Sequence, residues 1–380
     1  MVERLTWCEV SAQALRANLA EFRRLVGPAC RLAPVVKANA YGHGLVPASR
    51  VLADAGADVL CVNDLWEASV LREAGLALPL HVVGRVPPEQ AGDAVALDAS
   101  VVAYDAEVLA ALDGAGRAAG RVARAHLKVE TGTNRQGVGP GELRALCRLA
   151  AGMTGVRVTG LSTHFADIED TTDHGYAREQ MARFREAAAI AAAEGLVLDE
   201  PNLANSAATI LWPETHLAMV RVGIAVYGMW PSKETLVSAA LAHRDRIVLR
   251  PALAWKTRIA QVKEVAAGDW IGYGRSYRTT HATRLAVLPV GYYDGYDRKL
   301  SNLAYVLVDG RRAPVRGRIC MNMTLVDVTD VPGARAGDEV VLLGAQGDDA
   351  VTAEQFASWA DTINYEVTTR IAESIPRKII

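Results

Sequence analysis

The stretch APVVKANAYGHG, residues 33–44, places a lysine at the end of a short apolar run. Pro34, Val35 and Val36 are typical of a buried strand, and Lys37 follows them directly. Because burial disfavours the charged form of an amine, such a lysine either extends to water or becomes a neutral, reactive amine. A neutral amine is a nucleophile that can hold a carbonyl compound as a Schiff base. The stretch therefore predicts a strand that ends at a candidate active-site lysine.

The pattern around this stretch predicts a barrel. Runs rich in Val, Leu and Ala recur near residues 33, 57, 78, 99, 124, 156, 199 and 219. Amphipathic segments of helical period lie between most of them, such as VSAQALRANLAEFRRLVG and REQMARFREAAAIAAAEG. Apolar strands that alternate with helices indicate a parallel sheet covered on both faces, and about eight such units favour a TIM-type (β/α)8 barrel. The alternative is an open doubly wound sheet, although no GxGxxG motif opens a helix after the first strand.

A different pattern begins near residue 240. Turn signals such as AAGDW, VDGRR and RAGDE separate Val- and Ile-rich runs. We therefore expect two domains: a barrel over residues 1–240 that carries the lysine, and a mainly antiparallel β domain over residues 241–380. One late helix is expected near TAEQFASWADTI, with Thr352 as its N-cap and Gln355 three residues on.

Composition excludes several classes of protein. The net charge of −2 over 380 residues gives no basic surface for nucleic acid or an acidic membrane. The N-terminus lacks the apolar stretch of a signal peptide, and no run is long enough to cross a bilayer. The five cysteines are scattered without a CxxC pair, which argues against a zinc site or a disulfide framework. These features predict a cytoplasmic enzyme without a metal.

Polar residues collect at the predicted C-terminal ends of the strands, where barrel active sites lie. They are Lys37, Tyr41, Lys128, Glu130, Arg135, His164, Asn205, Ser206, Arg221, Gly223 and Ile224. Each has an ordinary structural explanation: Ser206 could cap a helix, His164 could form a local hydrogen bond, and the arginines could be in ion pairs. Together, a phosphate-type site at Ser206 and Gly223 and a lysine at the same rim suit pyridoxal 5'-phosphate.

Nine motifs, in order along the chain, resemble those of alanine racemases, the fold-type III pyridoxal phosphate-dependent amino-acid racemases. They are VVKANAYGHG, LKVETGTNRQGV, GLSTHFAD, ANSAA, RVGIAVYG, IGYGRSY, LPVGYYDGY, GRICMNM and INYEV. The resemblance implies a barrel followed by a β domain. It also implies a head-to-tail homodimer with shared active sites, and an amino-acid substrate.

The resemblance also implies roles for individual residues. Lys37 would be the Schiff-base lysine and one catalytic base, and Tyr273, from the second subunit, would be the base on the opposite face. The cofactor phosphate would be held by Tyr41, Ser206, Gly223, Ile224 and Tyr365. Arg221 would face the pyridine nitrogen, with His164 beside it, and Arg135 would bind the phenolic oxygen and the substrate carboxylate. Met321 and Tyr292 would contact or admit the substrate, and Lys128 matches a position that is carbamylated in some members.

The implied function is the interconversion of L-alanine and D-alanine for peptidoglycan synthesis. Two departures lie near the substrate pocket: Asn322 where the family often has aspartate, and Thr133 where it usually has methionine. A racemase for serine or for a broader set of amino acids is therefore an alternative. A barrel-type pyridoxal phosphate decarboxylase of basic amino acids and a small, non-enzymatic cofactor-binding barrel without the second domain are further alternatives.

Overall fold

The computed structural model describes residues 4–244 and 246–380. Contacts divide the chain into two compact units. The first, here called the barrel unit, holds residues 14–40 and 45–250, and the second, the β unit, holds residues 4–13, 41–44 and 251–380. The sequence-based division into residues 1–240 and 241–380 places residues 4–13 and 41–44 in the barrel domain, whereas the contacts place them in the β unit.

Parallel strands form the core of the barrel unit, as predicted. They are β2 (Arg31–Pro34), β3 (Leu60–Val62), β4 (Leu80–Arg85), β5 (Ala99–Ala103), β6 (Ala123–Lys128), β7 (Val156–Ser162) and β8 (Met219–Val222). Strands β3 to β7 pair in chain order, β2 pairs with β8, and a bridge between Val35 and Cys61 joins β2 to β3. Nearly all side chains of these strands are buried, which explains their continuous apolar runs.

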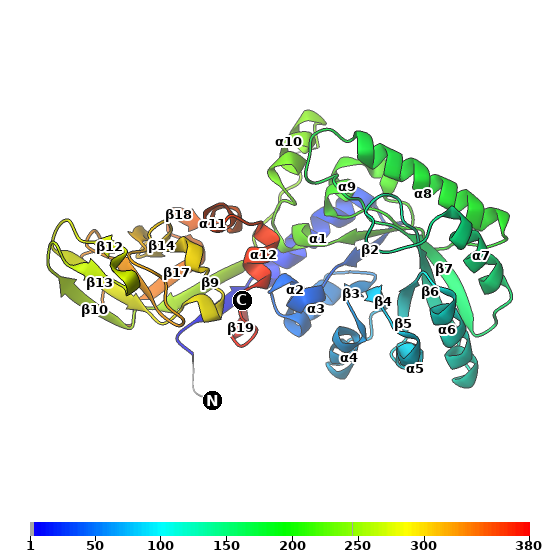
Figure 1. The fold of residues 1–380 in the computed structure, drawn as a ribbon, viewed down its shortest axis with the longest axis horizontal. Coiled ribbons are helices and arrows are strands. Elements are labelled where there is room, and N and C mark those ends of the chain that lie inside the picture. Colours follow the sequence, from blue (N-terminus) through cyan, green and yellow to red (C-terminus); the bar gives the residue numbers. More distant parts are fainter. Residues whose placement is uncertain (1–3, 245) are drawn as a thin grey trace. The chain divides into compact units, whose positions relative to one another are not determined.

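Helices connect and cover these strands. They are α1 (Ala12–Val26), α3 (Leu45–Asp54), α4 (Leu65–Glu73), α5 (Ala91–Ala96), α6 (Ala106–Ala118), α7 (Pro140–Ala151), α8 (Gly175–Ala193), α9 (Ser206–Leu211) and α10 (Lys233–Leu241). Figure 1 shows α4 to α8 outside strands β3 to β7. Several helices begin at side-chain caps, such as that of α6 at Asp105, whose carboxylate accepts from Val108 N–H at 2.8 Å.

The predicted strand near residue 199 is not a regular strand. Asn202 forms a single bridge with Ser162, and its N–H donates to Leu161 O at 2.9 Å. On the other side, Arg221 N–H of β8 donates to Ala204 O at 3.0 Å. Pro201 has no N–H to extend the ladder, so this segment closes the barrel with isolated hydrogen bonds.

A left-handed turn follows β2. Ala38, Asn39, Ala40 and Tyr41 all have φ between 52° and 55°, in the segment labelled α2 (Lys37–Tyr41). Such a conformation costs an L-residue roughly 1–2 kcal/mol, so the surroundings must hold it. Buried Glu67 accepts a hydrogen bond from Ala38 N–H at 2.7 Å, and Asn39 Oδ1 accepts from Leu45 N–H at 2.7 Å.

The β unit is mainly antiparallel, as predicted. Its strands are β1 (Trp7–Val10), β9 (Leu253–Arg258), β10 (Gln261–Val265), β11 (Trp270–Ile271), β12 (Tyr277–Arg278), β13 (Thr283–Leu288), β14 (Tyr305–Val308), β15 (Arg311–Pro314), β16 (Thr324–Asp327), β17 (Glu339–Gln346), β18 (Asp349–Val351) and β19 (Arg377–Ile379). The largest sheet has the order β15-β14-β17-β9-β1-β19, in which only the β1–β19 pair is parallel. A second sheet has the order β10-β13-β16.

Two helices, α11 (Ala353–Ala360) and α12 (Asn364–Thr369), come late in the β unit. The predicted cap of α11 is confirmed, because Thr352 Oγ1 accepts from Gln355 N–H at 3.1 Å. The Gln355 side chain donates to Tyr305 Oη instead of returning to Thr352, so the reciprocal half of a capping box is not formed.

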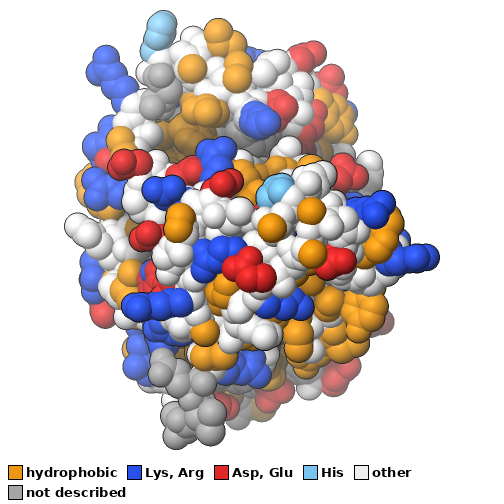
Figure 2. All heavy atoms as spheres, turned by 90° about the vertical axis from the view of Figure 1, so that its left-hand side faces the viewer, with side chains coloured by type: hydrophobic (Ala, Val, Ile, Leu, Met, Phe, Trp, Pro, Cys, Tyr) orange, Lys and Arg blue, Asp and Glu red, His pale blue; other side chains and the backbone are white. Residues whose placement is uncertain are grey.

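Three features of the structure bear on the predictions made from composition: the charges on the surface, the state of the cysteines and the length of the helices. Basic, acidic and hydrophobic side chains are interspersed on the face shown in Figure 2. All five cysteines are free thiols, four of them buried. Within the described part of the chain, every helix is too short or too polar to traverse a bilayer.

Candidate active site

Lys37 directly follows β2 and its bridge to β3, at the C-terminal end of the barrel strands. Burial and the charges of Arg135 and Arg221 lower the pKa of its amine, against the opposing charge of Glu67. A lowered pKa means that more of the amine is neutral at neutral pH. Lys37 is therefore suited to act as a nucleophile or a base.

Basic groups surround Lys37. Burial, followed by the charges of Arg221 and Arg135, lowers the pKa of Lys128 far below its usual range. Burial and the same arginines also lower the pKa of His164 well below its usual range. Across residues 4–244 and 246–380, no carboxylate forms an ion pair with Lys37, Lys128, Arg135 or Arg221. The cluster is therefore built for an anionic ligand.

Arg221 of β8 is 6% exposed and is fixed by two acceptors. One terminal nitrogen donates to Thr163 O at 2.7 Å, and the other donates to Asn202 Oδ1. Burial lowers the pKa of Arg221 to about 10, so its guanidinium remains a cation at neutral pH. It can donate hydrogen bonds to a ligand but does not give up its proton.

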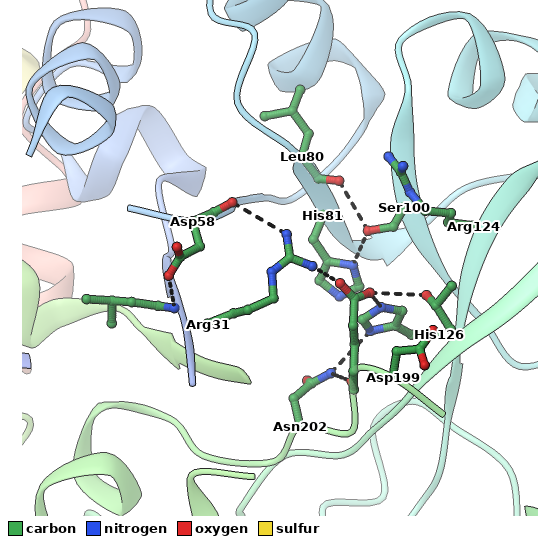
Figure 3. A network of polar contacts seen from close by, with 12 residues as sticks. Arg31, Asp58, Leu80, His81, Ser100, Arg124, His126, Asp199 and Asn202 are labelled. Carbon is green, nitrogen blue, oxygen red and sulfur yellow. Dashed lines mark hydrogen bonds and ion pairs between the residues drawn. The ribbon is translucent and has the colours of Figure 1, made fainter. Parts of the chain in front are cut away.

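Asn202 in turn contacts a second buried group (Figure 3). Its Nδ2 donates to His126 Nδ1 at 3.2 Å, and His126 Nε2 lies 2.9 Å from Glu200 Oε2. Since Nδ1 is an acceptor, the His126 proton resides on Nε2 and is donated to Glu200. Burial and the charges of Arg221 and Arg31 lower the pKa of His126 to about 3, so the ring is neutral.

This buried histidine predicts a loss of stability in acid. The pKa of histidine in an unfolded chain is about 6.5, so between about pH 6.5 and pH 3 the unfolded chain binds a proton that the folded chain does not. We expect the free energy of unfolding to fall with decreasing pH, by up to about 1.4 kcal/mol per pH unit for this group. Urea unfolding at pH 7 and pH 5 measures the effect. His126→Asn should weaken the pH dependence and the exposed control His281→Asn should not; equal pH dependence in native chain and His126→Asn would contradict the assignment.

Three buried residues form the candidate phosphate site. Ser206 begins α9 and is 3% exposed, and its Oγ accepts from Gly223 N–H at 2.9 Å. Ile224 begins a short 3-10 helix (Ile224–Tyr227). The first N–H groups of a helix have no acceptor within it, so they can bind an anion. The sequence-based alternative for Ser206 is wrong, because the cap of α9 is Asn205, whose Oδ1 accepts from Ala208 N–H.

Arg135 lies on a loop organised by Glu130. The Glu130 carboxylate accepts from Gly132 N–H at 2.5 Å and from Arg135 N–H at 3.1 Å. Burial raises the pKa of Glu130, but these and neighbouring N–H donors outweigh it and lower the pKa. Thr133 Oγ1 donates to His164 O at 2.7 Å, which links the loop to β7's C-terminal end. The exposed Arg135 side chain therefore extends from a fixed backbone.

Tyr41 and Tyr365 lie together in the β unit, with ring centroids 6.0 Å apart. Gly42 follows Tyr41 with φ +84°, and a Cβ there would lie 1.9 Å from Thr368 O of α12. Only glycine permits this approach. Arg377 Nε also donates to Gly42 O at 3.0 Å, so both tyrosines are on segments with fixed backbones.

Tyr273 lies in a turn of the β unit with its side chain 71% exposed. Glycines with positive φ, Gly272 and Gly274, flank it, and a Cβ on either would press against Arg318. Tyr292 and Met321 are on adjoining backbone segments, because Tyr292 N–H donates to Cys320 O and Tyr293 N–H donates to Met321 O. The Asn322 side chain donates to Asp294 at 3.4 Å beside them.

The structure thus gathers Lys37, Lys128, Arg135, His164 and Arg221 in the barrel unit, and Tyr41 and Tyr365 in the β unit. Sequence reasoning missed two supporting residues, Glu67 and Asn202. Asp64 and Glu67 have the spacing of a capping box at the start of a helix, and Asp64 Oδ1 does accept from Glu67 N–H. The Glu67 carboxylate, however, accepts from Ala38 N–H and Asn63 N–H instead of completing the capping box.

Comparison with known proteins agrees with this arrangement. Residues 10–231 match the family model of the alanine racemase N-terminal domain, and residues 252–379 match that of the C-terminal domain. An alanine racemase of Symbiobacterium thermophilum is 44% identical over 374 residues, 98% of this chain and 97% of that protein.

Solved structures give the same result. The alanine racemase of Streptomyces lavendulae superposes with a TM-score of 0.91 at 38% identity, over 100% of this chain and 98% of that one. That of Bartonella henselae, which carries covalently bound pyridoxal phosphate, superposes over 100% of both chains with a TM-score of 0.86 at 24% identity and shares the fold. This chain therefore belongs to the alanine racemase family, a family of amino-acid isomerases.

Proposed function

We propose that this member of the alanine racemase family uses pyridoxal 5'-phosphate and two bases, Lys37 and Tyr273, to interconvert L-alanine and D-alanine. The observation that carries the proposal is the set of unpaired basic groups around a lysine of lowered pKa. Among the described residues no carboxylate forms an ion pair with Arg135 or Arg221, so these two cations can take an anionic ligand, and this cofactor has both a phosphate and a phenolic oxygen.

The residues present fit the cofactor. Lys37 offers a partly neutral amine for its aldehyde. Ser206, Gly223 and Ile224, with Tyr41 and Tyr365, would hold the phosphate; Arg135 would bind the phenolic oxygen. Arg221 would donate to the ring nitrogen as a cation and leave that nitrogen without a proton, since its pKa of about 10 keeps the guanidinium charged. His164 would lie beside the ring and Arg221.

When bound, the cofactor supplies an electron sink that acidifies the Cα–H bond of the amino acid. The protein must then remove a proton from one face and return one to the other. Lys37 Nζ would act on one face, because its lowered pKa leaves a free amine. Tyr273 Oη would act on the opposite face, Arg135 would orient the substrate carboxylate, and Met321 and Tyr292 would border the amino acid.

We further propose that Lys128 is carbamylated. Its amine is buried, and burial and the charges of Arg221 and Arg135 lower its pKa far below the usual range, which favours the neutral, nucleophilic form. Addition of carbon dioxide with loss of one proton would create an anion between Arg221 and Arg135. After exchange with 13C-bicarbonate, a carbamate carbon signal is expected for the native chain and not for Lys128→Met; its absence from the native chain would contradict the modification.

A cytoplasmic homodimer with shared sites completes the proposal. Tyr273, Met321 and Tyr292 are 71%, 55% and 43% exposed, unusual for large side chains with catalytic roles. We infer that the partner subunit covers them, so that each site takes Lys37 from one chain and Tyr273 from the other.

Mixing two inactive variants tests this sharing. Lys37→Ala and Tyr273→Phe chains that reassemble should regain activity, because one of the two sites in a mixed dimer then contains both native residues. With random reassembly about one quarter of the native activity is expected. Each variant mixed with itself is the control, and absence of recovery in verified mixed dimers would show that both bases come from one chain.

The substrate is tested by incubating the chain with single amino acids and separating the enantiomers by chiral chromatography. L-alanine should racemise faster than L-serine, without release of carbon dioxide. If serine racemises with a higher kcat/KM than alanine, serine is the substrate. That result would argue against a role in supplying D-alanine for peptidoglycan.

A further inference from the structure

Glu67 is a buried carboxylate in the first turn of α4, with 6% of the residue exposed. Both of its oxygens accept from backbone N–H groups: Oε1 from Ala38 and Oε2 from Asn63, each at 2.7 Å. A protonated carboxyl would turn one oxygen into a hydroxyl, which is a poorer acceptor, so these two bonds favour the ionised form. Glu67 is therefore a buried anion held by the backbone.

The two N–H groups continue the connection between β2 and β3. A single bridge between Val35 and Cys61 joins these strands, and Val36 N–H donates to Cys61 O at 2.8 Å. The chain after β2 then enters the left-handed turn. Glu67 accepts from the residue that follows Lys37 on one side and from the residue that follows β3 on the other. It therefore links the two strand ends next to the lysine.

The support for Glu67 is itself fixed. Asn63 O accepts from Gly84 N–H of β4 at 2.9 Å, and a Cβ on Gly84 would lie 2.4 Å from that oxygen. The two segments are thus as close as glycine allows. Asp64 Oδ1 accepts from Glu67 N–H at 3.0 Å, which fixes the start of α4. The carboxylate therefore extends from a rigid backbone.

This carboxylate controls the backbone next to Lys37. Ala38, Asn39 and Ala40 have φ of 53° to 55°, a conformation that L-residues do not favour by themselves. The peptide group between Lys37 and Ala38 is planar, so holding the Ala38 N–H also fixes the plane attached to Lys37 Cα. Glu67 thereby determines the direction in which the Lys37 side chain leaves the strand.

Glu67 also acts on the Lys37 amine by charge. Burial lowers the pKa of this amine, Arg135 and Arg221 lower it further, and the charge of Glu67 raises it. Burial raises the pKa of Cys61 to about 12, so this neighbouring thiol is neutral. The titratable groups that act electrostatically with Lys37 are Cys61 of β3, Glu67 of α4, Lys128 of β6, Arg135 and His164 on the following loops, and Arg221 of β8. Glu67 is the one carboxylate in this set.

We propose that Glu67 is a positioning residue for Lys37: its carboxylate fixes the peptide that follows the lysine and supplies the negative charge among the basic groups around it. The structural part of this proposal stands on the two hydrogen bonds. Its catalytic consequence rests on the proposed function, because Lys37 must then reach both the cofactor aldehyde and the substrate Cα.

The charge of Glu67 is tested on the full-length, cofactor-free chain by trace acetylation with acetic anhydride over a series of pH values. The neutral amine is the reactive form. Mass spectrometry of the Lys37 peptide, referred to exposed Lys233, therefore gives the pH midpoint of the Lys37 amine. Glu67→Gln removes the charge at nearly constant size and should lower this midpoint by about 0.5 pH unit or more.

Asp64→Asn is the matched control, since it makes the same chemical change at the start of the same helix. Asparagine retains the helix cap, and Glu67 remains ionised, so the Lys37 midpoint should equal that of the native chain. An unchanged midpoint in Glu67→Gln, or an equal fall in Asp64→Asn, would overturn the proposal.

The positioning role is tested with Glu67→Asp in the cofactor-loaded chain. This variant keeps the charge but is one methylene shorter, which draws the carboxylate away from the N–H groups of Ala38 and Asn63. The kcat for alanine should fall about 10-fold or more, because a displacement of about 1 Å at a reacting group costs up to about 10²-fold. The Lys37 labelling midpoint should stay close to the native value.

Native kcat in Glu67→Asp would overturn the positioning role. A native chain without racemase activity would instead contradict the proposed function. The labelling midpoint needs neither cofactor nor substrate, so it still decides whether Glu67 acts on Lys37 in that case.

Discussion

Lys37→Ala is expected to lose the long-wavelength cofactor absorbance and at least 1,000-fold in kcat. The expectation follows from two roles of one amine: it would hold the cofactor's aldehyde and transfer a proton at Cα. General base catalysis alone contributes about 10²–10⁴-fold, and the loss of the covalent attachment adds to it. Absorbance of the dialysed chain and racemase assays in both directions measure the two effects separately.

The fold should survive this substitution. Lys37 forms no ion pair with the described carboxylates, and its removal relieves repulsion from Arg135 and Arg221. Lys233→Ala, an exposed lysine at the start of α10 in the same unit, is the matched control and should keep both absorbance and activity. Retention of the cofactor absorbance after dialysis of Lys37→Ala would show that another group holds the cofactor.

Tyr273→Phe is expected to lower kcat by about 10²–10⁴-fold and leave the cofactor absorbance intact. The substitution removes one hydroxyl from a side chain that is 71% exposed, so the thermal midpoint should not change. A loss of activity without a loss of stability or of cofactor would indicate a chemical role for the hydroxyl.

Tyr293→Phe provides the control for this prediction. Tyr293 is 66% exposed in the same unit, and its link to Met321 is through backbone N–H, which phenylalanine retains. Activity should therefore remain near the native value. A Tyr273→Phe chain as active as Tyr293→Phe would remove Tyr273 from the mechanism.

Much of the barrel could be predicted because buried parallel strands have continuous apolar sequences. The same rule failed near residue 199, where Pro201 prevents a regular ladder. The segment WCEV at residues 7–10 was expected in the barrel domain, yet it forms β1 between β9 and β19. Long-range pairing of this kind leaves no local signal in the sequence.

The candidate site likewise contains residues whose positions could be predicted and a turn that could not. The strand ends predicted the positions of Lys37, Lys128, Arg135, His164 and Arg221, because parallel strands bring their C-terminal ends to one rim. The left-handed turn after Lys37 could not be predicted, since Ala38 and Ala40 have no preference for positive φ. It depends on Glu67 and Asn39, whose contacts exist only in the folded chain.

The central claim is that Lys37 and Tyr273 transfer protons on opposite faces of the substrate. It is tested most directly by following exchange of the Cα hydrogen of D-alanine and of L-alanine in D2O by NMR, with Tyr273→Phe. Tyr273→Phe is expected still to exchange the Cα hydrogen of D-alanine through Lys37, with little inversion, and to exchange that of L-alanine far more slowly. Equal slowing of exchange for the two enantiomers would contradict it.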